Sequence, residues 1–422
     1  MFGKRKTPVA KPLLEMVIVP RSAIERAATP GKEYVLVGAV VNFVNAMMSQ
    51  GLYSRHEIPA KALHAYHADY YLAQVNNGGH HQFIHNCSAM LKFAVPDIRG
   101  GLSGMAANSH LAIFEEMAAL LEKFPDGRSL LAAPENKSLD GLDSRFYALE
   151  KGTPMSKLSA AWIARWPELR VLDDAEARKA IQESALLNPA RDARMLWRSI
   201  QRLDTQMTDR LHVAIGLACA NATPPQIMIE LGYGNMQEIA GVRQQCWFVK
   251  TSTMASATQA LRICAVSDDH AAAYECIQPD NPPMPKFGDV EGYLQAMRDG
   301  RTLRLKEPYA GQKLSQVGDE TIAGVIQLAT RYRAAAALDL LLRRAKIETE
   351  RAKASAYTIA QEESGPTIKW FVAAGRHLLF AVIGAEAAIL WNPAEKRGIA
   401  AVERGEVEGH FERAKTGAVT LD

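Results

Sequence analysis

The chain has 422 residues, more than one hydrophobic core usually serves, and its length therefore predicts two or three domains. Hydrophobic residues make up 48% and charged residues 23% of the sequence, a balance that excludes a largely disordered or collagen-like chain. The formal net charge is only +3, too small to indicate a nucleic acid or an anionic membrane as the partner.

Cysteine spacing and apolar runs predict the compartment. Five cysteines are spread along the chain without a C-x-x-C spacing, which favours reduced thiols over a disulfide framework. Lys4, Arg5 and Lys6 are not followed by a sustained apolar run, so the beginning of the chain does not resemble a secretory signal. The most apolar late stretch, 377–391, is shorter than the roughly 20 residues of a membrane-spanning helix. We therefore expect a cytoplasmic protein without a membrane segment.

Residues 1–34 contain seven basic and three acidic side chains together with four prolines. This composition predicts a flexible, mildly basic leader, with at most a short strand at 16–19. Residues 35–174 are expected to form an all-helical domain, because apolar residues recur there at helical spacing. Its predicted helices cover 35–48, 59–75, 110–124, 146–149 and 157–166.

The stretch 70–86 is the most distinctive of the chain. Helical spacing as far as Val75 is followed by Asn76-Asn77-Gly78-Gly79, residue types that accept left-handed backbone angles and end helices. A second short helix is expected from about His80. The preferred interpretation is a rigid corner whose amides are satisfied internally, and the alternative is a polar recognition pocket. The candidate binding residues are Tyr70, Asn76, Asn77, Gly78, Gly79, Gln82, Phe83 and Asn86.

This stretch resembles a bacterial family of unknown function that is typified by a DNA-mimic protein, which binds a transcription factor. The residues that match the family's hallmark lie between Val75 and Asn86, and similar segments follow at 105–121, 139–147 and 162–168. The resemblance covers about residues 35–174. It implies a mostly helical, non-enzymatic domain that acts through a protein surface.

The charge of this region bears on mimicry of DNA. Residues 35–174 carry 12 basic and 14 acidic side chains, a net charge of −2. Duplex DNA presents on the order of one negative charge per 1.7 Å of its axis. Such a balance predicts no uniformly negative face, so the sequence disfavours mimicry of DNA.

Histidines cluster in the same region, where six of the eleven lie between 56 and 85. His64 and His67 are three residues apart and His81 and His85 four apart, so each pair can share a helix face at metal-ligand spacing. No H-E-x-x-H motif is present, and the nearest acid is Asp69. We therefore expect no metal and no cofactor, with these four histidines as the only weak metal candidates.

The familiar motifs of catalysis are missing from the sequence. It contains no G-x-S-x-G elbow for a nucleophile, no G-x-x-x-x-G-K-[ST] phosphate loop and no G-x-G-x-x-G after a strand. No catalytic residue is predicted, and a role other than that of an enzyme is favoured.

The remainder, 175–422, resembles no family that we recognise. Residues 175–285 are expected to form a helical middle region with helices at 193–219 and 255–266, ending in the proline-rich loop 278–285. Residues 286–422 are expected to form an α+β domain. One or two long helices at 319–363 precede a β-meander built from the apolar runs 368–372, 378–383, 388–391 and 398–402. Its aromatic residues are predicted to pack one sheet face against the helices: Trp370, Phe371, Phe380 and Trp391.

The predicted fold class is α+β and mostly α, with a helical N-terminal domain, a helical middle and a small antiparallel meander near the C-terminus. The favoured function is that of a non-catalytic cytoplasmic protein-interaction or regulatory protein. Its partner is expected to be an unidentified protein, without direct binding to nucleic acid or membrane. Two alternatives stay open: an effector or immunity-type component of a bacterial conflict system, and a metal-dependent hydrolase that uses the His64–His85 region. The sequence does not specify the oligomeric state.

Overall fold

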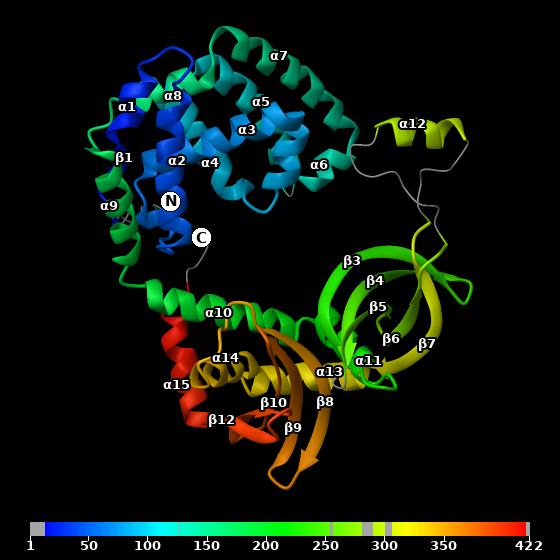
Figure 1. Ribbon diagram of the computed structural model, residues 1–422. Helices are drawn as coiled ribbons and strands as arrows, with labels where there is room; N and C mark the ends of the chain where they lie inside the picture. Colours follow the sequence, from blue (N-terminus) through cyan, green and yellow to red (C-terminus); the bar gives the residue numbers. More distant parts are fainter. Residues whose placement is uncertain (1–12, 126, 254–255, 281–289, 300–305, 419–422) are drawn as a thin grey trace, which may run out of the picture. The chain divides into compact units, whose positions relative to one another are not determined.

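The structure, a computed structural model, describes residues 13–125, 127–253, 256–280, 290–299 and 306–418 (Figure 1). These residues divide into two compact units, 13–192 and 193–418, each with its own hydrophobic core. Helices hold 53% and strands 26% of the chain, which confirms the α+β class with helix predominant. Within the described ranges, no helix is long and apolar enough to cross a membrane.

The first unit begins with a strand that pairs with a second strand near the end of the same unit. β1 (Val17–Pro20) pairs in parallel with β2 (Leu169–Leu172), which lies about 150 residues later in the chain. The β-branched side chains of β1 suit a strand and are buried. Helix α1 (Arg21–Ala27) follows directly. Residues 17–27, which the sequence places in the leader, thus form β1 and α1.

Seven longer helices build the rest of this unit, and the predicted helices at 35–48 and 110–124 are confirmed. The longer helices are α2 (Tyr34–Ser49), α3 (Ala60–Cys87), α4 (Leu91–Gly104), α5 (Asn108–Lys123), α7 (Ser138–Gly152), α8 (Met155–Ile163) and α9 (Asp174–Leu186). The short helix α6 (Arg128–Ala132) and the 3-10 turns η1 (Arg55–Glu57) and η2 (Pro134–Lys137) connect them. Their core centres on Tyr71, whose ring makes edge contacts with Phe83, Phe114 and Phe146.

The second unit starts with the helices α10 (Arg191–Thr208) and α11 (Arg210–Ala220), which confirm the predicted helical stretch 193–219. A five-stranded antiparallel sheet follows, which the sequence did not predict. Its strands are β3 (Ile227–Ile239), β4 (Val242–Thr253), β5 (Ser256–Val266), β6 (His270–Ile277) and β7 (Tyr309–Gly318). Helix α12 (Val290–Arg298) lies between β6 and β7 in the sequence. Part of the proline-rich loop, 281–285, lies outside the described residues.

The helix predicted at 255–266 is wrong, because this segment is the strand β5. The sheet curls until β3 and β7 contact each other (Figure 1), and the successive residues 263–265 of β5 are all buried. Cys264 on one face belongs to the main core of the unit, whereas Ile263 on the other face packs with Phe248 and Tyr274 in a separate cluster. A strand with two apolar faces shows no alternation of apolar and polar residues, which is why its period was misread.

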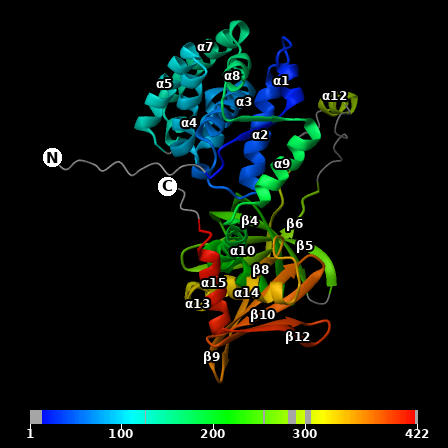
Figure 2. The ribbon, with the colours of Figure 1, turned by 90° about the vertical axis from the view of Figure 1, so that its left-hand side faces the viewer.

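The C-terminal meander is confirmed and has one strand more than expected. Helices α13 (Asp319–Arg331) and α14 (Ala334–Arg344) precede it, and α15 (Arg404–Lys415) follows it. Its strands are β8 (Lys353–Glu362), β9 (Gly365–Ala374), β10 (His377–Ile383), β11 (Ala387–Asn392) and β12 (Arg397–Glu403). Residues 353–362, expected to continue a helix, are therefore a strand. Both α14 and α15 contact this sheet (Figure 2).

The aromatic residues of the meander divide between its two faces, which corrects the prediction that all of them pack against helices. Trp370 is fully buried in the core shared with α14, whereas Phe371, the next residue on the strand, points to the opposite face. Phe380 packs edge-on against Phe371 there. Trp391 pairs with Phe380 across β10 and β11 and stays partly exposed.

The second unit repeats one order of elements. Two helices followed by a five-stranded antiparallel meander occur first as α10, α11 and β3–β7, and then as α13, α14 and β8–β12. The sequence shows no internal repeat, so this similarity is visible only in the tertiary structure.

Candidate functional site

The predicted helix–corner–helix at 70–86 is confirmed by the backbone of α3. The helix is interrupted at Gly78 (φ −170°, ψ 30°) and Gly79 (φ 73°, ψ −173°), and helical geometry resumes at His80. The positive φ of Gly79 is a conformation that residues with a Cβ atom rarely adopt. A Cβ on Gly79 would also collide with the carboxylate of Asp143 on α7. Two independent constraints therefore require glycine here.

Asp143 fixes the start of the helix after the corner. Its Oδ1 accepts a hydrogen bond from the backbone N–H of His80 at 2.8 Å and a second from the imidazole Nδ1 of the same residue. The first N–H groups of a helix have no partner within the helix, and a carboxylate there also interacts favourably with the helix dipole. Asp143 therefore acts as the cap of the second half of α3.

His80 connects this cap to the aromatic core. Its Nε2 lies 2.8 Å from the hydroxyl oxygen of Tyr71, and both side chains are 0% exposed. Burial lowers the pKa of His80, although Asp143 opposes this effect, and burial raises the pKa of Tyr71 well above its usual value. A neutral imidazole then donates from Nδ1 to Asp143 and accepts at Nε2 from Tyr71. The His80 and Tyr71 side chains are sealed from solvent, and their hydrogen bonds serve the fold.

The amide side chains of the motif fall into two groups. The Oε1 atom of Gln74 accepts hydrogen bonds from Gln82 Nε2 at 3.1 Å and from Asn86 Nδ2 at 2.7 Å, so these amides bridge the corner. Asn76 and Asn77 are exposed, and neither side chain has a hydrogen-bond partner among the described residues. The structure thus brings Gln82 and Asn86 together on Gln74, a partner that the sequence did not single out. It leaves Asn76 and Asn77 exposed to solvent.

Two further contacts complete the corner. Tyr147 on α7 donates its hydroxyl proton to the carbonyl oxygen of Val75 at 2.7 Å, which satisfies one carbonyl at the end of the first half of α3. Phe83 is fully buried, and Tyr70 is half-buried beside its ring, with 6.5 Å between the ring centroids. The aromatic candidates of the motif therefore belong to the core and its margin.

His64 and His67 lie beside a carboxylate that is already engaged. Asp97 on α4 accepts a hydrogen bond from Arg55 Nη2 at 2.7 Å. Its oxygens also lie 2.8 Å from His67 Nδ1 and 3.9 Å from His64 Nε2. The contact between His67 Nδ1 and Asp97 is not aligned as a hydrogen bond. His67 Nδ1 is therefore buried without a hydrogen-bond partner among the described residues. A metal bound to these histidines would have to compete with Arg55 for Asp97.

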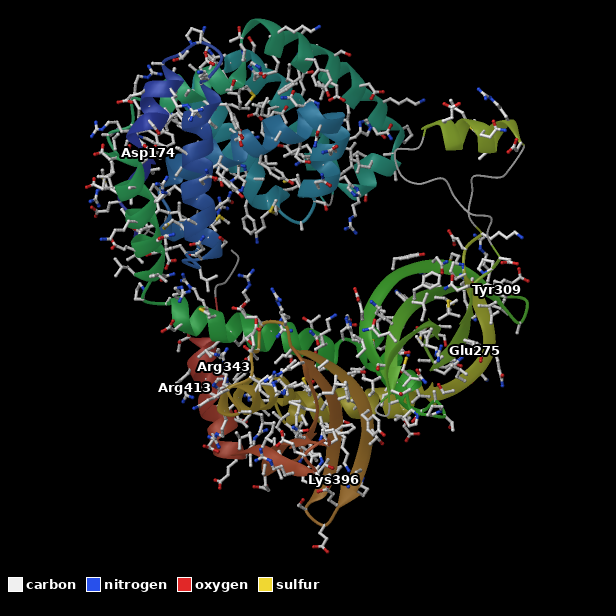
Figure 3. The ribbon with its side chains drawn as sticks, viewed as in Figure 1. Asp174, Glu275, Tyr309, Arg343, Lys396 and Arg413 are labelled. Atoms are coloured by element: carbon white, nitrogen blue, oxygen red, sulfur yellow. The ribbon has the colours of Figure 1, made fainter. Side chains whose placement is uncertain are left out.

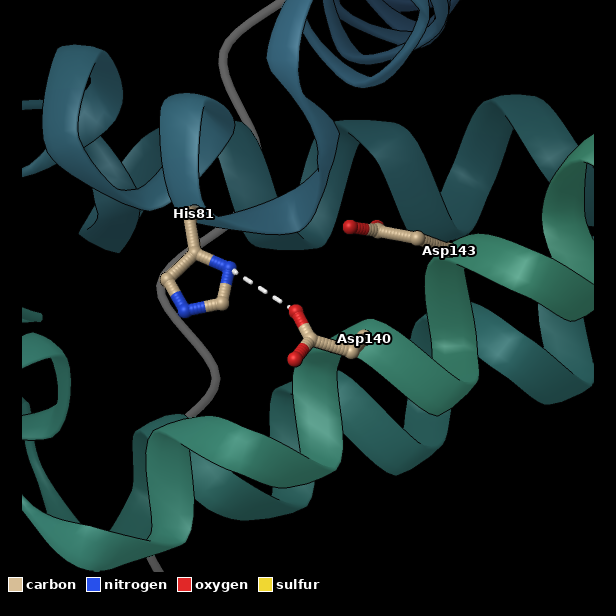
Figure 4. Close-up of side chains that lie close together, drawn as sticks. All are labelled: His81, Asp140 and Asp143. Carbon is tan, nitrogen blue, oxygen red and sulfur yellow. Dashed lines mark ion pairs between the residues drawn. The ribbon is translucent and has the colours of Figure 1, made fainter.

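His81 and His85, the other candidate pair, have different surroundings. His81 lies near two carboxylates of α7, and its Nδ1 is 3.9 Å from Asp140 Oδ1 (Figure 4). His81, Asp140 and Asp143 form the one group, within the part of the chain that the structure describes, whose three ligand atoms all lie within 4.8 Å of one another. His85 is exposed and is not part of this group. The sequence missed both aspartates because they lie about 60 residues from His81.

Several carboxylates of this unit are held by basic side chains. Glu115 and Glu116 on α5 are bonded to Arg99 and Arg145, respectively. Glu168 accepts from Lys61, as Asp97 does from Arg55. Residues 56–166 contain 11 acidic residues and 10 Lys or Arg residues. This near balance of charges does not supply the continuous negative surface that mimicry of DNA requires.

A shallow hollow of about 300 Å³ lies between α5 and α7. Leu120 and Leu142 supply its apolar side chains, and the ion pair between Glu116 and Arg145 lies at its wall. Gly141 contributes no side chain, and a Cβ there would meet nothing within 4 Å. The sequence did not predict this feature, because its residues come from two helices.

Asp69 on α3 is a carboxyl group whose pKa is shifted by its surroundings. Burial raises its pKa to about 6, which outweighs the opposing hydrogen bond from the Tyr34 hydroxyl at 3.4 Å. The hollow beside it has room for only about 10 Å³, roughly one water molecule. The charged form of Asp69 is therefore poorly solvated.

We expect Asp69→Asn to raise the free energy of unfolding at pH 7 by about 2 kcal/mol, since one pKa unit corresponds to about 1.4 kcal/mol. A carboxyl whose pKa is raised in the folded state contributes full stability below its unfolded pKa of 3.8 and loses it as the pH rises through about 6. Urea unfolding between pH 4 and pH 7 measures this slope, which should become smaller in the variant. Identical slopes for the two proteins would show that Asp69 is well solvated.

The second unit contains two groups with the residue types of a Ser-His-Asp triad, and neither has its geometry. In the turn before β6, His270 Nδ1 faces both Ser267 Oγ at 3.0 Å and Asp269 Oδ1 at 2.8 Å, whereas a triad uses the two ring nitrogens separately. The other group is built around Asp339, which is fully buried. Neither arrangement activates a nucleophile.

Comparison with known proteins places one part of the chain in a family. Residues 56–166 match the family described as DMP19-like protein, a stretch that lies within the 35–174 of the resemblance seen in the sequence. The first unit therefore contains a DMP19-like domain. No curated protein and no solved structure matches the chain.

Proposed function

We propose that this protein, whose first unit carries a DMP19-like domain, is a non-catalytic interaction protein that binds a protein partner through the corner of α3. We define the corner surface as Asn76, Asn77, Gly78 and Tyr147. The observation that carries the proposal is the exposure of two neighbouring amide side chains that have no partner among the described residues. They lie at a corner whose backbone accepts a hydrogen bond from Tyr147 and donates one to Asp143.

The corner surface is suited to hydrogen bonding with another protein. Each asparagine offers two N–H donors and a carbonyl acceptor, which complement the N–H and C=O groups of a polypeptide. Tyr147 is 38% exposed, and its hydroxyl is held by Val75, so its ring is presented in a fixed orientation. Tyrosine is enriched in protein interfaces. A rigid surface loses little conformational entropy when it binds, which favours affinity.

The charges of the domain indicate how the partner would be recognised. Residues 56–166 carry 11 acidic residues against 10 Lys or Arg residues, and some of these charges are paired, so long-range attraction to a basic protein contributes little. Hydrogen bonds and apolar contacts would then supply most of the binding energy. This distinguishes the proposed mode of binding from mimicry of DNA, which depends on phosphate-like charge.

Affinity capture from the cells that make the protein tests the proposal. The full chain and its Asn108→Ala variant, which changes an exposed asparagine on α5, are expected to retain one dominant partner. The double variant Asn76→Ala, Asn77→Ala should lose it, with a Kd for the purified partner raised at least tenfold. Increasing the salt from 0.15 M to 0.5 M should change the Kd by less than about threefold.

Retention of the partner by the double variant would contradict the assignment of the corner surface. Strong weakening by salt would instead favour a charged interface such as mimicry uses. If the partner proves to be a nuclease or a toxin, the role in a bacterial conflict system gains support.

A further inference from the structure

We infer that His81, Asp140 and Asp143 form a binding site for one divalent transition-metal ion on the surface of the first unit. This inference does not depend on the proposed partner surface. One potential ligand atom from each residue lies within 4.8 Å of the other two. Ligand atoms around a tetrahedral zinc ion at about 2.1 Å are about 3.4 Å apart, so side-chain movements of roughly 1 Å would complete the set.

The fold places the three residues on two rigid elements. His81 belongs to the first helical turn after the corner, which Asp143 and Gly79 hold in place. Asp140 and Asp143 are three residues apart on α7 and therefore share one face of that helix. Figure 4 shows the imidazole of His81 and the carboxylate of Asp140 pointing toward each other from the two helices.

A second layer of hydrogen bonds orients one of the ligands. The backbone N–H and the ring Nδ1 of His80 both bond to Oδ1 of Asp143. Oδ2 has no hydrogen bond among the described residues. Ligands of functional metal sites are commonly held by such outer hydrogen bonds, which fix the direction of the lone pairs. Asp143 therefore has both an oxygen without a hydrogen bond among the described residues and the fixed orientation of a metal ligand.

The charge at the cluster is not compensated by the protein. Within the described ranges, neither Asp140 nor Asp143 pairs with a lysine or an arginine, and their only ionisable partners are His81 and His80. Nearby Glu116, by contrast, is bonded to Arg145 through both oxygens. Two carboxylates with only imidazoles beside them leave a local negative charge that a divalent cation would neutralise.

The exposure of the residues allows an ion to enter and water to complete its coordination. The side chain of Asp140 is 78% exposed and that of His81 is 36% exposed. Three protein ligands leave at least one position to water, as in open metal sites. An imidazole among the ligands favours zinc, iron or nickel over magnesium and calcium, which prefer oxygen ligands alone.

Isothermal titration of the metal-free full chain with ZnCl2 tests the inference. We expect one zinc ion per chain with a micromolar or tighter Kd, and a thermal midpoint that rises by several degrees in the presence of zinc. His81→Ala and Asp140→Ala should each weaken binding at least tenfold. His85→Ala changes an exposed histidine one turn further along the same helix and should bind as the parent does.

The results that would overturn the inference are equally specific. It fails if zinc does not bind more tightly than millimolar, or if His81→Ala and Asp140→Ala bind zinc as the parent does. It also fails if His85→Ala loses as much affinity as His81→Ala, because a different ligand set would then be responsible. Circular dichroism in EDTA should show the parent spectrum for all three variants, since each changed side chain is at the surface. Asp143 is left intact in these tests because it also supports the fold.

Discussion

Replacing Asp143 by alanine is expected to lower the free energy of unfolding of the first unit by about 3 kcal/mol, since it breaks a buried charged hydrogen-bond network. The change removes the acceptor of the His80 backbone N–H and of its ring Nδ1. The imidazole is 0% exposed and cannot turn to water instead. The Nδ1–H group of His80 would then be an unsatisfied donor in the centre of the aromatic core. The loss should be seen as a lower urea midpoint in metal-free buffer.

Asp140→Ala is the matched control, because it removes an exposed carboxylate one turn earlier on the same helix. Its free energy of unfolding in EDTA should lie within about 0.5 kcal/mol of the parent value. Hydrogen exchange of peptides from α3 and α7 can follow the first unit separately from the second. Equal losses in the two variants would mean that the bonds to His80 do not hold the corner.

Replacing Asp339 by alanine is expected to have a similar or larger effect on the second unit, about 3–5 kcal/mol. Asp339 on α14 is fully buried and joins three helices. Its Oδ1 accepts from Ser199 on α10 at 2.5 Å, and its Oδ2 accepts from Arg343 at 2.7 Å and from His410 on α15 at 2.7 Å. Figure 3 labels Arg343 beside α10 and α15. Without the carboxylate, several donors lose their partner at once.

The pH dependence provides a second measurement for Asp339. Burial alone would raise its pKa, but the hydrogen bonds from His410, Arg343 and Ser199 outweigh it and lower the pKa below 3.8. A carboxyl with a lowered pKa stabilises the fold above its unfolded pKa and loses that contribution as the pH falls. The parent should therefore lose more stability than Asp339→Ala below about pH 4.

Glu348→Ala is the control for this experiment, because Glu348 is exposed and has no partner among the described residues. Urea unfolding at pH 7 should leave this variant close to the parent. If Asp339→Ala proves equally mild, the three helices are held by apolar contacts alone. Hydrogen exchange in α14 and α15 would then be unchanged as well.

Local features of the chain were predictable where neighbouring residues alone decide them. The corner is an example, since glycine at 79 accepts a positive φ and asparagines precede it, all within one short stretch. The break in α3 and the helix after it were therefore correctly expected. The meander near the C-terminus was also predicted, because its apolar runs are short and separated by glycine, charged and turn-forming residues.

Features that depend on covered surfaces were not predictable in the same way. The strand β5 was taken for a helix, since a strand that is buried on both faces loses the alternation by which a strand is recognised. Trp370 and Phe371 were assigned to one face, although neighbouring residues of a strand point in opposite directions. This error was one of interpretation, because the period of two of a strand already places the two side chains on opposite faces.

The candidate site shows the same division between local and distant information. The sequence by itself determined the corner of α3, the exclusion of known catalytic motifs and the resemblance of the first unit to a family, because these reside in continuous segments. The tertiary structure leaves Asn76 and Asn77 exposed, without a partner among the described residues. Only the tertiary structure decided that Asp143 caps the corner and that Asp140 lies beside His81. These relations join residues about 60 positions apart, and their side chains meet only after the helices have packed.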